Sequence, residues 1–346
     1  MADVLGIGII GAGASGAMHA AALREVREAR LAAVADVDAA RVQAFAETWG
    51  VPRTYGSIEG LLSDPEIDVV HICTPPFLHE PQALAAMASG KHVLVEKPIA
   101  RTVAEATRIV SAAREARIVL GGVFQHRHMP LPRQVKEVLE SGRLGRLYLC
   151  DAYVKWWRED AYYKSVRWRG TRDFEGGGAM INQGIHTIDL LLWLAGPVVE
   201  VSGEVATLAH PIEMEDVAVA TLRFASGALG VLEATTTAWP GFAERIELHG
   251  SGGSVILDEG EGTIEWRLRG EEPRRTAEVG QQGTGAADPT KISLAGHQAE
   301  FRDFYAAIRD GRKPAITGEE AIRALAVIEA IRLSSELGKR VAVPRA

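Results

Sequence analysis

The sequence predicts an α/β N-terminal domain with a doubly wound parallel sheet, followed by an α+β domain built on a large, mainly antiparallel sheet. From residue 4 to about 123, short β-branched runs alternate with alanine-rich segments of helical period. After Arg146, strand-like runs follow one another with only turn residues between them. At 346 residues the chain is longer than one hydrophobic core usually serves. We therefore expect two domains, residues 1–124 and 125–346.

The N-terminal half is expected to contain five parallel strands with helical crossovers between them. The strands are Leu5–Ile10, Leu31–Ala35, Asp68–Thr74, His92–Glu96 and Ile118–Gly122. Asp38 is predicted to cap a helix over Ala39–Trp49, and Thr102 a helix over Val103–Arg114. Each of these side chains offers an oxygen to the unpaired backbone N–H groups at a helix start.

The C-terminal half is expected to contain two hairpins and three helices. The hairpin strands are Val217–Phe224 with Ala228–Thr237, and Arg245–His249 with Ser254–Asp258 around a glycine-rich turn. The helices are Ala179–Leu194, His297–Arg309 and Glu319–Leu337, and either of the last two could pack back on the N-terminal domain. Gly270–Thr290 is predicted to be a mobile loop.

Composition argues against several classes of partner and compartment. The net charge of -7 gives no general attraction to nucleic acid or to anionic lipid. The two cysteines, Cys73 and Cys150, are far apart and form neither a disulfide framework nor a zinc-binding spacing, so we expect no metal and a reducing, cytoplasmic compartment. The N-terminus lacks an export signal, and no apolar run approaches the roughly 18 residues of a membrane span.

A glycine-rich motif follows the first expected strand and opens a helix. It reads Gly11-Ala12-Gly13-Ala14-Ser15-Gly16 and matches G-x-G-x-x-G. Gly11 permits the tight turn, Gly13 lets the backbone approach a pyrophosphate, and Gly16 allows close helix–strand packing. Free N–H groups at the helix start attract the anion. The motif indicates a Rossmann domain that binds a dinucleotide through Gly11, Gly13, Ala14, Ser15 and Gly16; the alternative is a tight turn without a ligand.

An acidic residue indicates which dinucleotide is bound. Asp36 stands twenty positions after Gly16, at the end of the second strand, where its carboxylate can accept hydrogen bonds from both ribose hydroxyls of an adenosine. A carboxylate there repels a 2′-phosphate, and no arginine immediately follows it. The sequence therefore favours NAD over NADP.

Several further motifs carry a family resemblance that covers nearly the whole chain. They are the run Cys73–His79, the tripeptide Glu96–Pro98, the segment Trp168–Thr171, the pair Gly177-Gly178 and the run Gly184–Asp189. In combination they resemble the Gfo/Idh/MocA oxidoreductases, the family that includes glucose–fructose oxidoreductase and inositol dehydrogenase.

The resemblance implies two catalytic residues. In the family the lysine of Glu-Lys-Pro meets the substrate hydroxyl near the nicotinamide, which gives this role to Lys97, and His186 occupies the position of the catalytic histidine. Lys97 also lies just past the carboxyl end of a parallel strand, where ligands bind in doubly wound folds. The alternatives are a solvated Lys97 paired with Glu96 and a His186 that satisfies core hydrogen bonds. A cis peptide at Pro98 is also implied, and we expect Lys97 and His186 to converge over one nicotinamide face.

Asn182 is a departure from the family pattern. Asn182, His186 and Asp189 are spaced by four and three, so they are expected on one helix face, with Asp189 orienting the histidine ring or serving structure. Many relatives carry aspartate at this position, whereas an amide cannot titrate. It can still hold a substrate hydroxyl or Lys97 by hydrogen bonds. The Asn-Gln-Gly-Ile-His form looks like the branch with nucleotide-sugar dehydrogenases that oxidise a 3-hydroxyl.

The remaining site residues follow from their positions beside these motifs. Substrate contacts are expected from Trp168, Arg169, Gln125 and Arg127, with a surface-loop role as the alternative for Trp168 and Arg169. Further cofactor contacts are expected from Thr74, Pro75, His79, Glu96 and Lys97.

Taken together, these residues predict an NAD(P)-dependent oxidoreductase. It would transfer a hydride between nicotinamide and a secondary alcohol of a sugar, a sugar derivative or a cyclic polyol. The alternatives are a cofactor-carrying sensor and a dehydrogenase of a non-carbohydrate substrate, such as an imine or dihydrodiol. A sensor would be expected to lack the lysine and histidine, and both are present. The resemblance and an exposed sheet face imply a homodimer or homotetramer.

Overall fold

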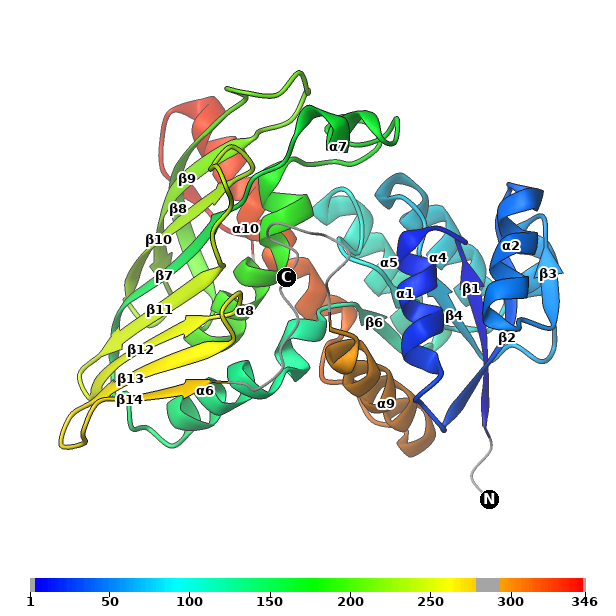
Figure 1. The fold of residues 1–346 in the computed structure, drawn as a ribbon, viewed down its shortest axis with the longest axis horizontal. Helices are drawn as coiled ribbons and strands as arrows, with labels where there is room; N and C mark the ends of the chain where they lie inside the picture. The colour runs from blue at the N-terminus through cyan, green and yellow to red at the C-terminus, as the bar shows by residue number, and fades with distance from the viewer. Residues whose placement is uncertain (1–3, 278–292, 345–346) are drawn as a thin grey trace. The chain divides into compact units, whose positions relative to one another are not determined.

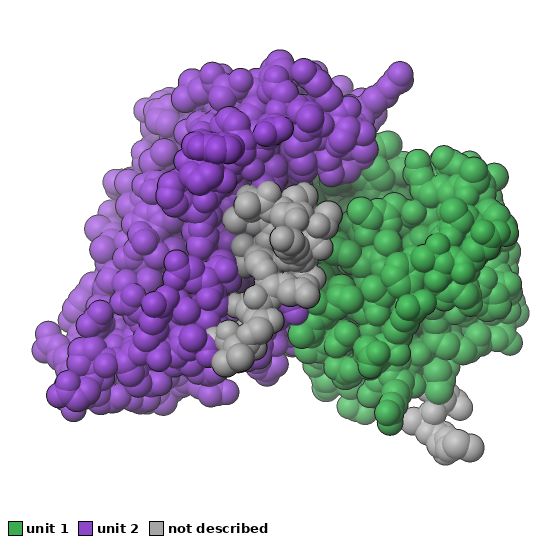
Figure 2. Space-filling model, viewed as in Figure 1, with its two compact units in different colours: residues 1–125, 294–322 green, residues 126–293, 323–346 purple. Residues whose placement is uncertain are grey.

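The computed structural model describes residues 4–277 and 293–344, and the chain divides into two compact units (Figure 2). Unit 1 contains residues 1–125 and 294–322, and unit 2 contains residues 126–293 and 323–346. The first crossing lies one residue beyond the expected boundary, and residues 294–322, which include one of the two helices expected to pack back, return to unit 1. No described helix combines the length and hydropathy required of a membrane span.

Unit 1 is built on a parallel sheet of six strands, in the order β3-β2-β1-β4-β5-β6. The five expected strands are confirmed as β1 (Leu5–Ile10), β2 (Ala29–Ala35), β4 (Val69–Ile72), β5 (His92–Val95) and β6 (Leu120–Gly122). The sixth, β3 (Arg53–Tyr55), pairs with β2 at the sheet edge. Its three residues are not fully buried, so no apolar run indicated a strand there.

Helices cover the faces of this sheet. They are α1 (Ala14–Leu23), α2 (Ala39–Trp49), α3 (Ile58–Leu62), η1 (Pro76–Leu78), α4 (His79–Ala88), α5 (Val103–Ala116) and α9 (Ala295–Asp310). The Asp38 and Thr102 side chains accept hydrogen bonds from the backbone N–H groups of Arg41 and Glu105, which confirms both predicted caps. α9 lies against α1 (Figure 1) and inserts Phe301 into the same core as Ile7 of β1.

Unit 2 is built on a nine-stranded sheet in the order β14-β13-β12-β11-β7-β10-β9-β8-β15. All neighbours are antiparallel except β7 and β10. The strands are β7 (Leu147–Lys155), β8 (Val198–Ala206), β9 (Val217–Phe224), β10 (Leu229–Thr235), β11 (Arg245–Gly250), β12 (Gly253–Asp258), β13 (Thr263–Leu268), β14 (Arg274–Ala277) and β15 (Val341–Ala342). Both expected hairpins are confirmed, as β9–β10 and β11–β12.

The loop expected over Gly270–Thr290 is corrected in its first part. β14 pairs with β13, and Trp266 donates its indole N–H to the Thr276 hydroxyl at 2.9 Å. This edge strand is fixed by backbone pairing and one buried tryptophan, which a search for apolar periodicity does not detect. The rest of that expected loop, from residue 278 on, lies outside the described residues.

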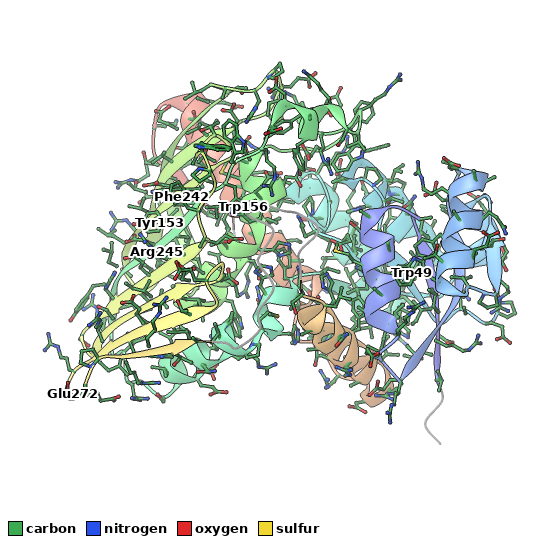
Figure 3. All side chains as sticks on the ribbon, viewed as in Figure 1. Trp49, Tyr153, Trp156, Phe242, Arg245 and Glu272 are labelled. Atoms are coloured by element: carbon green, nitrogen blue, oxygen red, sulfur yellow. The ribbon has the colours of Figure 1, made fainter. Side chains whose placement is uncertain are left out.

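The helices of unit 2 are η2 (Gln125–His128), α6 (Pro130–Glu140), α7 (Asp160–Lys164), the π-helical turn η3 (Met180–Gly184) and α8 (Ile185–Ala195), while α10 (Gly318–Leu337) contributes residues to both units. Of these, α8 packs on β7 and β11, η3 on β10 and α6 on β12 (Figure 1). Ala152 and Ile246 are buried on the face that α8 contacts. On the opposite face Tyr153 of β7 is paired with Arg245 of β11, whose guanidinium carbon lies 5.1 Å from the ring centroid (Figure 3).

Candidate active site

The glycine-rich turn has the backbone geometry of a pyrophosphate cradle. Gly11 has φ +102°, and a Cβ at this position would lie 2.7 Å from the Cys73 carbonyl oxygen. A Cβ on Gly16 would lie 2.1 Å from the Gly11 carbonyl oxygen. By contrast, a Cβ on Gly13 would meet no atom of the described residues within 4 Å, and no side chain among them caps the start of α1. The open space above Gly13 and the N–H groups of the first turn, which begins at Ala14 and Ser15, fit a bound dinucleotide.

Asp36 is oriented by the backbone around it. One carboxylate oxygen accepts the N–H of Ala12 at 2.9 Å, and the other accepts the N–H of Asp38 at 3.1 Å. Each oxygen keeps a lone pair for a ribose hydroxyl. An Arg41 nitrogen lies 3.6 Å from the Asp36 carboxylate. The sequence did not indicate this contact, because it is the first turn of α2 that places Arg41 beside Asp36.

We expect the substitution Asp36→Asn to lower the preference for NAD over NADP by roughly tenfold or more, because it removes the charge that repels a 2′-phosphate and leaves Arg41 to attract it. The measurement is the dissociation constant of each dinucleotide by calorimetry. Asp38→Asn is the matched control, since Asp38 also pairs with Arg41. An unchanged ratio in Asp36→Asn would contradict this role for Asp36.

His79 links the loops that follow β4 and β5. One ring nitrogen lies 2.7 Å from the Thr74 carbonyl oxygen and the other 2.8 Å from the Pro98 carbonyl oxygen. Burial lowers the pKa of His79, whereas the two carbonyl acceptors raise it, because each of them favours a proton on the ring nitrogen that it faces. Thr74 also donates its hydroxyl to Gln82 at 2.6 Å, and Pro75 precedes η1. The Lys97–Pro98 peptide is cis, as expected.

Glu96 anchors the lysine loop to a buried network. Its carboxylate accepts the Lys97 backbone N–H at 3.0 Å and lies 3.1 Å from His19 Nε2. The network continues from His19 Nδ1 to His71 Nδ1 at 2.9 Å, and from His71 Nε2 to the Tyr305 hydroxyl at 2.9 Å. Its members come from α1, β4, the end of β5 and α9, so it holds the start of the lysine loop on the core of unit 1.

The same network contains the one group of potential metal ligands found among residues 4–277 and 293–344. His19, Glu96 and His297 place ligand atoms within 4.8 Å of one another, all buried. Both ring nitrogens of His19 already face hydrogen-bonding partners, Glu96 and His71. His19 is therefore already engaged in hydrogen bonds within this cluster.

We expect Glu96→Gln to cost roughly 3 kcal/mol of unfolding free energy at pH 7 and almost nothing near pH 2. Burial alone would raise the pKa of Glu96, but the hydrogen bond and charge of His19, with the charges of His297 and Lys97, lower it from 4.5 to about 2. A depressed carboxyl pKa contributes stability that is fully present above pH 4.5 and is lost as the pH falls toward 2. Urea unfolding at pH 7, 5 and 3 measures this difference.

The matched control for that substitution is Glu115→Gln, on the exposed side of α5. It should change the unfolding free energy little at any of these pH values. A Glu96→Gln variant whose deficit is the same at pH 3 as at pH 7 would contradict the assigned ionisation.

In unit 2, Glu215 fixes the start of the helix that carries Asn182 and His186. Its carboxylate accepts backbone N–H groups from Gly178 at 3.3 Å and Met180 at 3.2 Å, and it is paired with Arg332. A Cβ on Gly178 would lie 1.9 Å from the Glu215 carbonyl oxygen, which explains the glycine. The carboxylate therefore caps the helix start from a loop far along the chain.

The expectation of one continuous α-helix over Ala179–Leu194 was wrong at its start. Met180–Gly184 forms a π-helical turn, and the α-helix begins at Ile185. The Asn182 and Gln183 amides both donate to the Tyr162 hydroxyl at 3.2 Å. The π-helical turn thus coincides with two tertiary hydrogen bonds from adjacent residues to one atom, which helical periodicity in the sequence does not report.

The Asn182 amide also donates to a buried carboxylate, Glu175 Oε1, at 2.6 Å. Its NH₂ group is thus held by two protein acceptors, Tyr162 and Glu175. The other Glu175 oxygen accepts the Gly170 N–H. Asn182 is therefore fixed in orientation within unit 2.

His186 and Asp189 of α8 both contact η2. The His186 ring stacks on the His126 ring, with centroids 4.6 Å apart and an interplanar angle of 6°. Arg127 donates two hydrogen bonds, at 2.7 and 2.5 Å, to the Asp189 carboxylate, and both side chains are buried. Arg127, expected to contact substrate, is thus engaged in an ion pair that joins η2 to α8.

Two other residues expected at the substrate, Arg169 and Trp168, lie near Tyr162 in unit 2. Arg169 donates to the Tyr162 carbonyl oxygen at 3.1 Å, and its guanidinium carbon lies 4.1 Å from the Tyr162 ring centroid and 5.6 Å from that of Trp168. Trp168 is half-buried. Gln125 is 7% exposed, and its Oε1 has no hydrogen-bond partner among the described residues.

Sequence reasoning missed several residues that organise these sites. Tyr162 belongs to none of the motifs named above, and His126 lies between two residues that were singled out, Gln125 and Arg127. Glu175 and Glu215 gave no signal in the sequence, because each binds a partner that only the folded chain brings to it.

Comparisons with known proteins agree with this geometry. A model of an oxidoreductase family with an NAD-binding Rossmann fold matches residues 5–122, and a model of the GFO/IDH/MocA C-terminal domain matches residues 133–256. The chain is 31% identical to 1,5-anhydro-D-fructose reductase of Ensifer adhaerens, over 87% of each protein. It is 28% identical to myo-inositol 2-dehydrogenase of Thermotoga maritima, over 95% of this chain and 96% of that protein.

A solved structure extends the likeness to nearly every residue. The WlbA dehydrogenase of Bordetella pertussis, in complex with NADH and UDP-GlcNAcA, has a TM-score of 0.86 and 30% identity, over 99% of both chains. Its fold and the two family matches account for both units. The chain belongs to the Gfo/Idh/MocA family of oxidoreductases, with an NAD-binding Rossmann domain at its N-terminal end.

Proposed function

We propose that this protein is an NAD-dependent dehydrogenase or reductase of a secondary alcohol on a sugar, a sugar derivative or a cyclic polyol. The observation that carries the proposal is the arrangement of three loops in unit 1. The glycine-rich turn, the Thr74–His79 loop and the Glu96–Pro98 loop follow the carboxyl ends of the neighbouring strands β1, β4 and β5. Open parallel sheets bind their ligands at the carboxyl ends of the strands.

When bound, NAD would supply the acceptor for the hydride. The part of the protein is to hold and move the hydroxyl proton. In oxidation Lys97 or His186 removes this proton from the substrate, and in reduction the same group returns it to the developing alkoxide. Lys97 lies between Glu96 and Pro98, which are both held by hydrogen bonds, and this supports its role as the group that meets the alcohol.

Asn182 does not take part in proton transfer in this proposal. Its amide has no titratable proton, and its NH₂ group is held by Tyr162 and Glu175. A lysine–aspartate relay, which an aspartate at this position would allow, is therefore not assigned. Asn182, Trp168 and Arg169 are proposed to shape the substrate site, and Arg127 to brace it through Asp189.

Two observations favour a hydroxyl-rich substrate. Gln125 presents a buried carbonyl oxygen that no described residue satisfies, and such an acceptor suits a sugar hydroxyl. The relatives named above act on an anhydro-sugar and on inositol, and WlbA was solved with a nucleotide sugar. We propose nucleotide sugars as the first substrates to test, because the Asn-Gln-Gly-Ile-His form also resembles that branch.

The test is incubation with NAD and a panel of sugars, polyols and nucleotide sugars, followed by the absorbance of reduced cofactor at several pH values. We expect turnover within this panel. Turnover only of dihydrodiols or imines, added as further arms, would move the protein to a non-carbohydrate dehydrogenase. NAD binding without any turnover would favour the cofactor-carrying sensor.

The remaining proposals concern assembly and compartment. We propose a homodimer or homotetramer that pairs through the sheet face bearing Tyr153 and Arg245, and light scattering of the purified protein measures the subunit number.

We propose a reducing cytoplasmic setting because both cysteines are free and buried. Fractionation of the native cell tests this compartment.

A further inference from the structure

We propose that His126 is a positioning residue for His186, and that Glu259 holds it in place. The inference rests on the proposed function, since it concerns how the second candidate base is oriented. All three residues belong to unit 2, and they come from η2, α8 and the residue directly after β12.

The first observation is the contact between the two imidazole rings. The rings are nearly parallel, at 6°, with centroids 4.6 Å apart. Nδ1 of His186 is buried, and the proposal assigns the contact with substrate to Nε2. A flat ring lying against His186 restricts rotation about its χ2, which otherwise varies broadly. The stack therefore sets the plane in which Nε2 points.

The second observation is that His126 is itself held. Its Nδ1 lies 2.9 Å from Glu259 Oε1, and the two side chains are 16% and 6% exposed. A carboxylate accepts hydrogen bonds, so His126 carries a proton on Nδ1. The second oxygen, Glu259 Oε2, is buried without a hydrogen-bond partner among the described residues. The hydrogen bond to His126 thus offsets part of the free-energy cost of removing the Glu259 carboxylate from water.

The third observation is that η2 and α8 are joined a second time next to this stack. Arg127, adjacent to His126, pairs with Asp189, one helical turn after His186. Rotation or sliding of α8 would break a buried ion pair as well as the ring stack. This double attachment suits a group whose position must be accurate, because small misplacements of a reacting group cost rate steeply.

The experiment is a double-mutant cycle with a spectroscopic readout. His126→Ala and Glu259→Gln are made in the full chain and combined with His186→Ala, and His249→Ala serves as the matched histidine control because it also contacts a glutamate. Using the substrate found in the panel, we expect His126→Ala to lower kcat by roughly 10-fold to 100-fold with little change in KM for NAD. In the His186→Ala background the same change should lower kcat less than about twofold.

His126→Phe keeps a ring against His186 and should retain most of the activity that His126→Ala loses. A loss of the same size in both backgrounds, or full activity of His126→Ala, would overturn the proposal. So would an equal loss in His126→Phe and His126→Ala with unchanged melting temperatures, since the stacked ring would then have no part in catalysis.

A second readout separates this inference from the proposed function. Spectra of ¹⁵N-histidine-labelled protein, assigned with His186→Ala, report the His186 ring without any turnover. We expect His126→Ala and Glu259→Gln to shift the His186 signals and His249→Ala to leave them in place. If no substrate in the panel were turned over, this would count against the proposed function alone. If the His186 signals were unchanged in His126→Ala, this would count against the inference.

Discussion

Replacing Lys97 with methionine is expected to lower kcat by roughly 100-fold to 10,000-fold, the range found for loss of a general acid–base group. Methionine has a similar length and no titratable proton, so it removes proton transfer while it fills the same space. NAD binding should stay nearly intact, because the glycine-rich turn and Asp36 are untouched. Steady-state kinetics on the substrate identified in the panel, together with calorimetric NAD titration, measure both effects.

Two further lysine substitutions serve as controls. Lys97→Arg keeps the positive charge but does not lose its proton near neutral pH, so it should be almost as impaired as the methionine variant. Lys313→Met, at an exposed position of unit 1, should behave like the wild type. Wild-type turnover by Lys97→Met on the true substrate would reject Lys97 as the base and leave His186 as the candidate.

Replacing Gly13 with valine is expected to weaken NAD binding by roughly 100-fold or more, or about 2.7 kcal/mol. Among residues 4–277 and 293–344 there is room for the side chain, since a Cβ on Gly13 meets none of their atoms within 4 Å and the backbone is extended at φ -87° and ψ -161°. The space that valine would fill is the one proposed for the pyrophosphate. Calorimetric titration with NAD and a thermal melt without it measure the two properties separately.

Gly16→Ala provides the contrast to this variant. Its Cβ would lie 2.1 Å from the Gly11 carbonyl oxygen, so it should lower the melting temperature as well as NAD affinity. Ala44→Val, on the exposed side of α2, should leave both unchanged. If Gly13→Val bound NAD as tightly as the wild type, the pyrophosphate of NAD would not bind above Gly13. This conclusion would hold whatever the result for Gly16→Ala.

Features encoded in short stretches of chain were predicted from the sequence. β1 and α2 have the expected bounds, and Asp38 and Thr102 cap the expected helices. The glycine-rich motif specified its own backbone shape, including the positive φ of Gly11. In each case the residues that form the pattern are also the residues of the element it specifies, or lie within a few positions of it. Periodicity, capping residues and glycine conformation were therefore sufficient to predict these elements.

Features that depend on distant partners were not predicted. The π-helical turn at Met180–Gly184 coincides with hydrogen bonds to Tyr162, twenty residues before Asn182. The cap on that helix comes from Glu215, and the partner of His126 is Glu259, 133 residues further along the chain. No local pattern in the sequence indicates which of many glutamates will reach a given helix or ring.

The sequence by itself thus determined the α/β and α+β classes, the dinucleotide motif and the family, because local backbone preferences and short motifs specify them. Only the tertiary structure decided which side chains hold the candidate catalytic groups. It placed Arg41 beside Asp36, tied Glu96 to His19, and stacked His126 on His186. The physical reason is that a buried charge or ring is fixed by whatever partner the folded chain brings within a few ångströms, and distance along the chain does not report that.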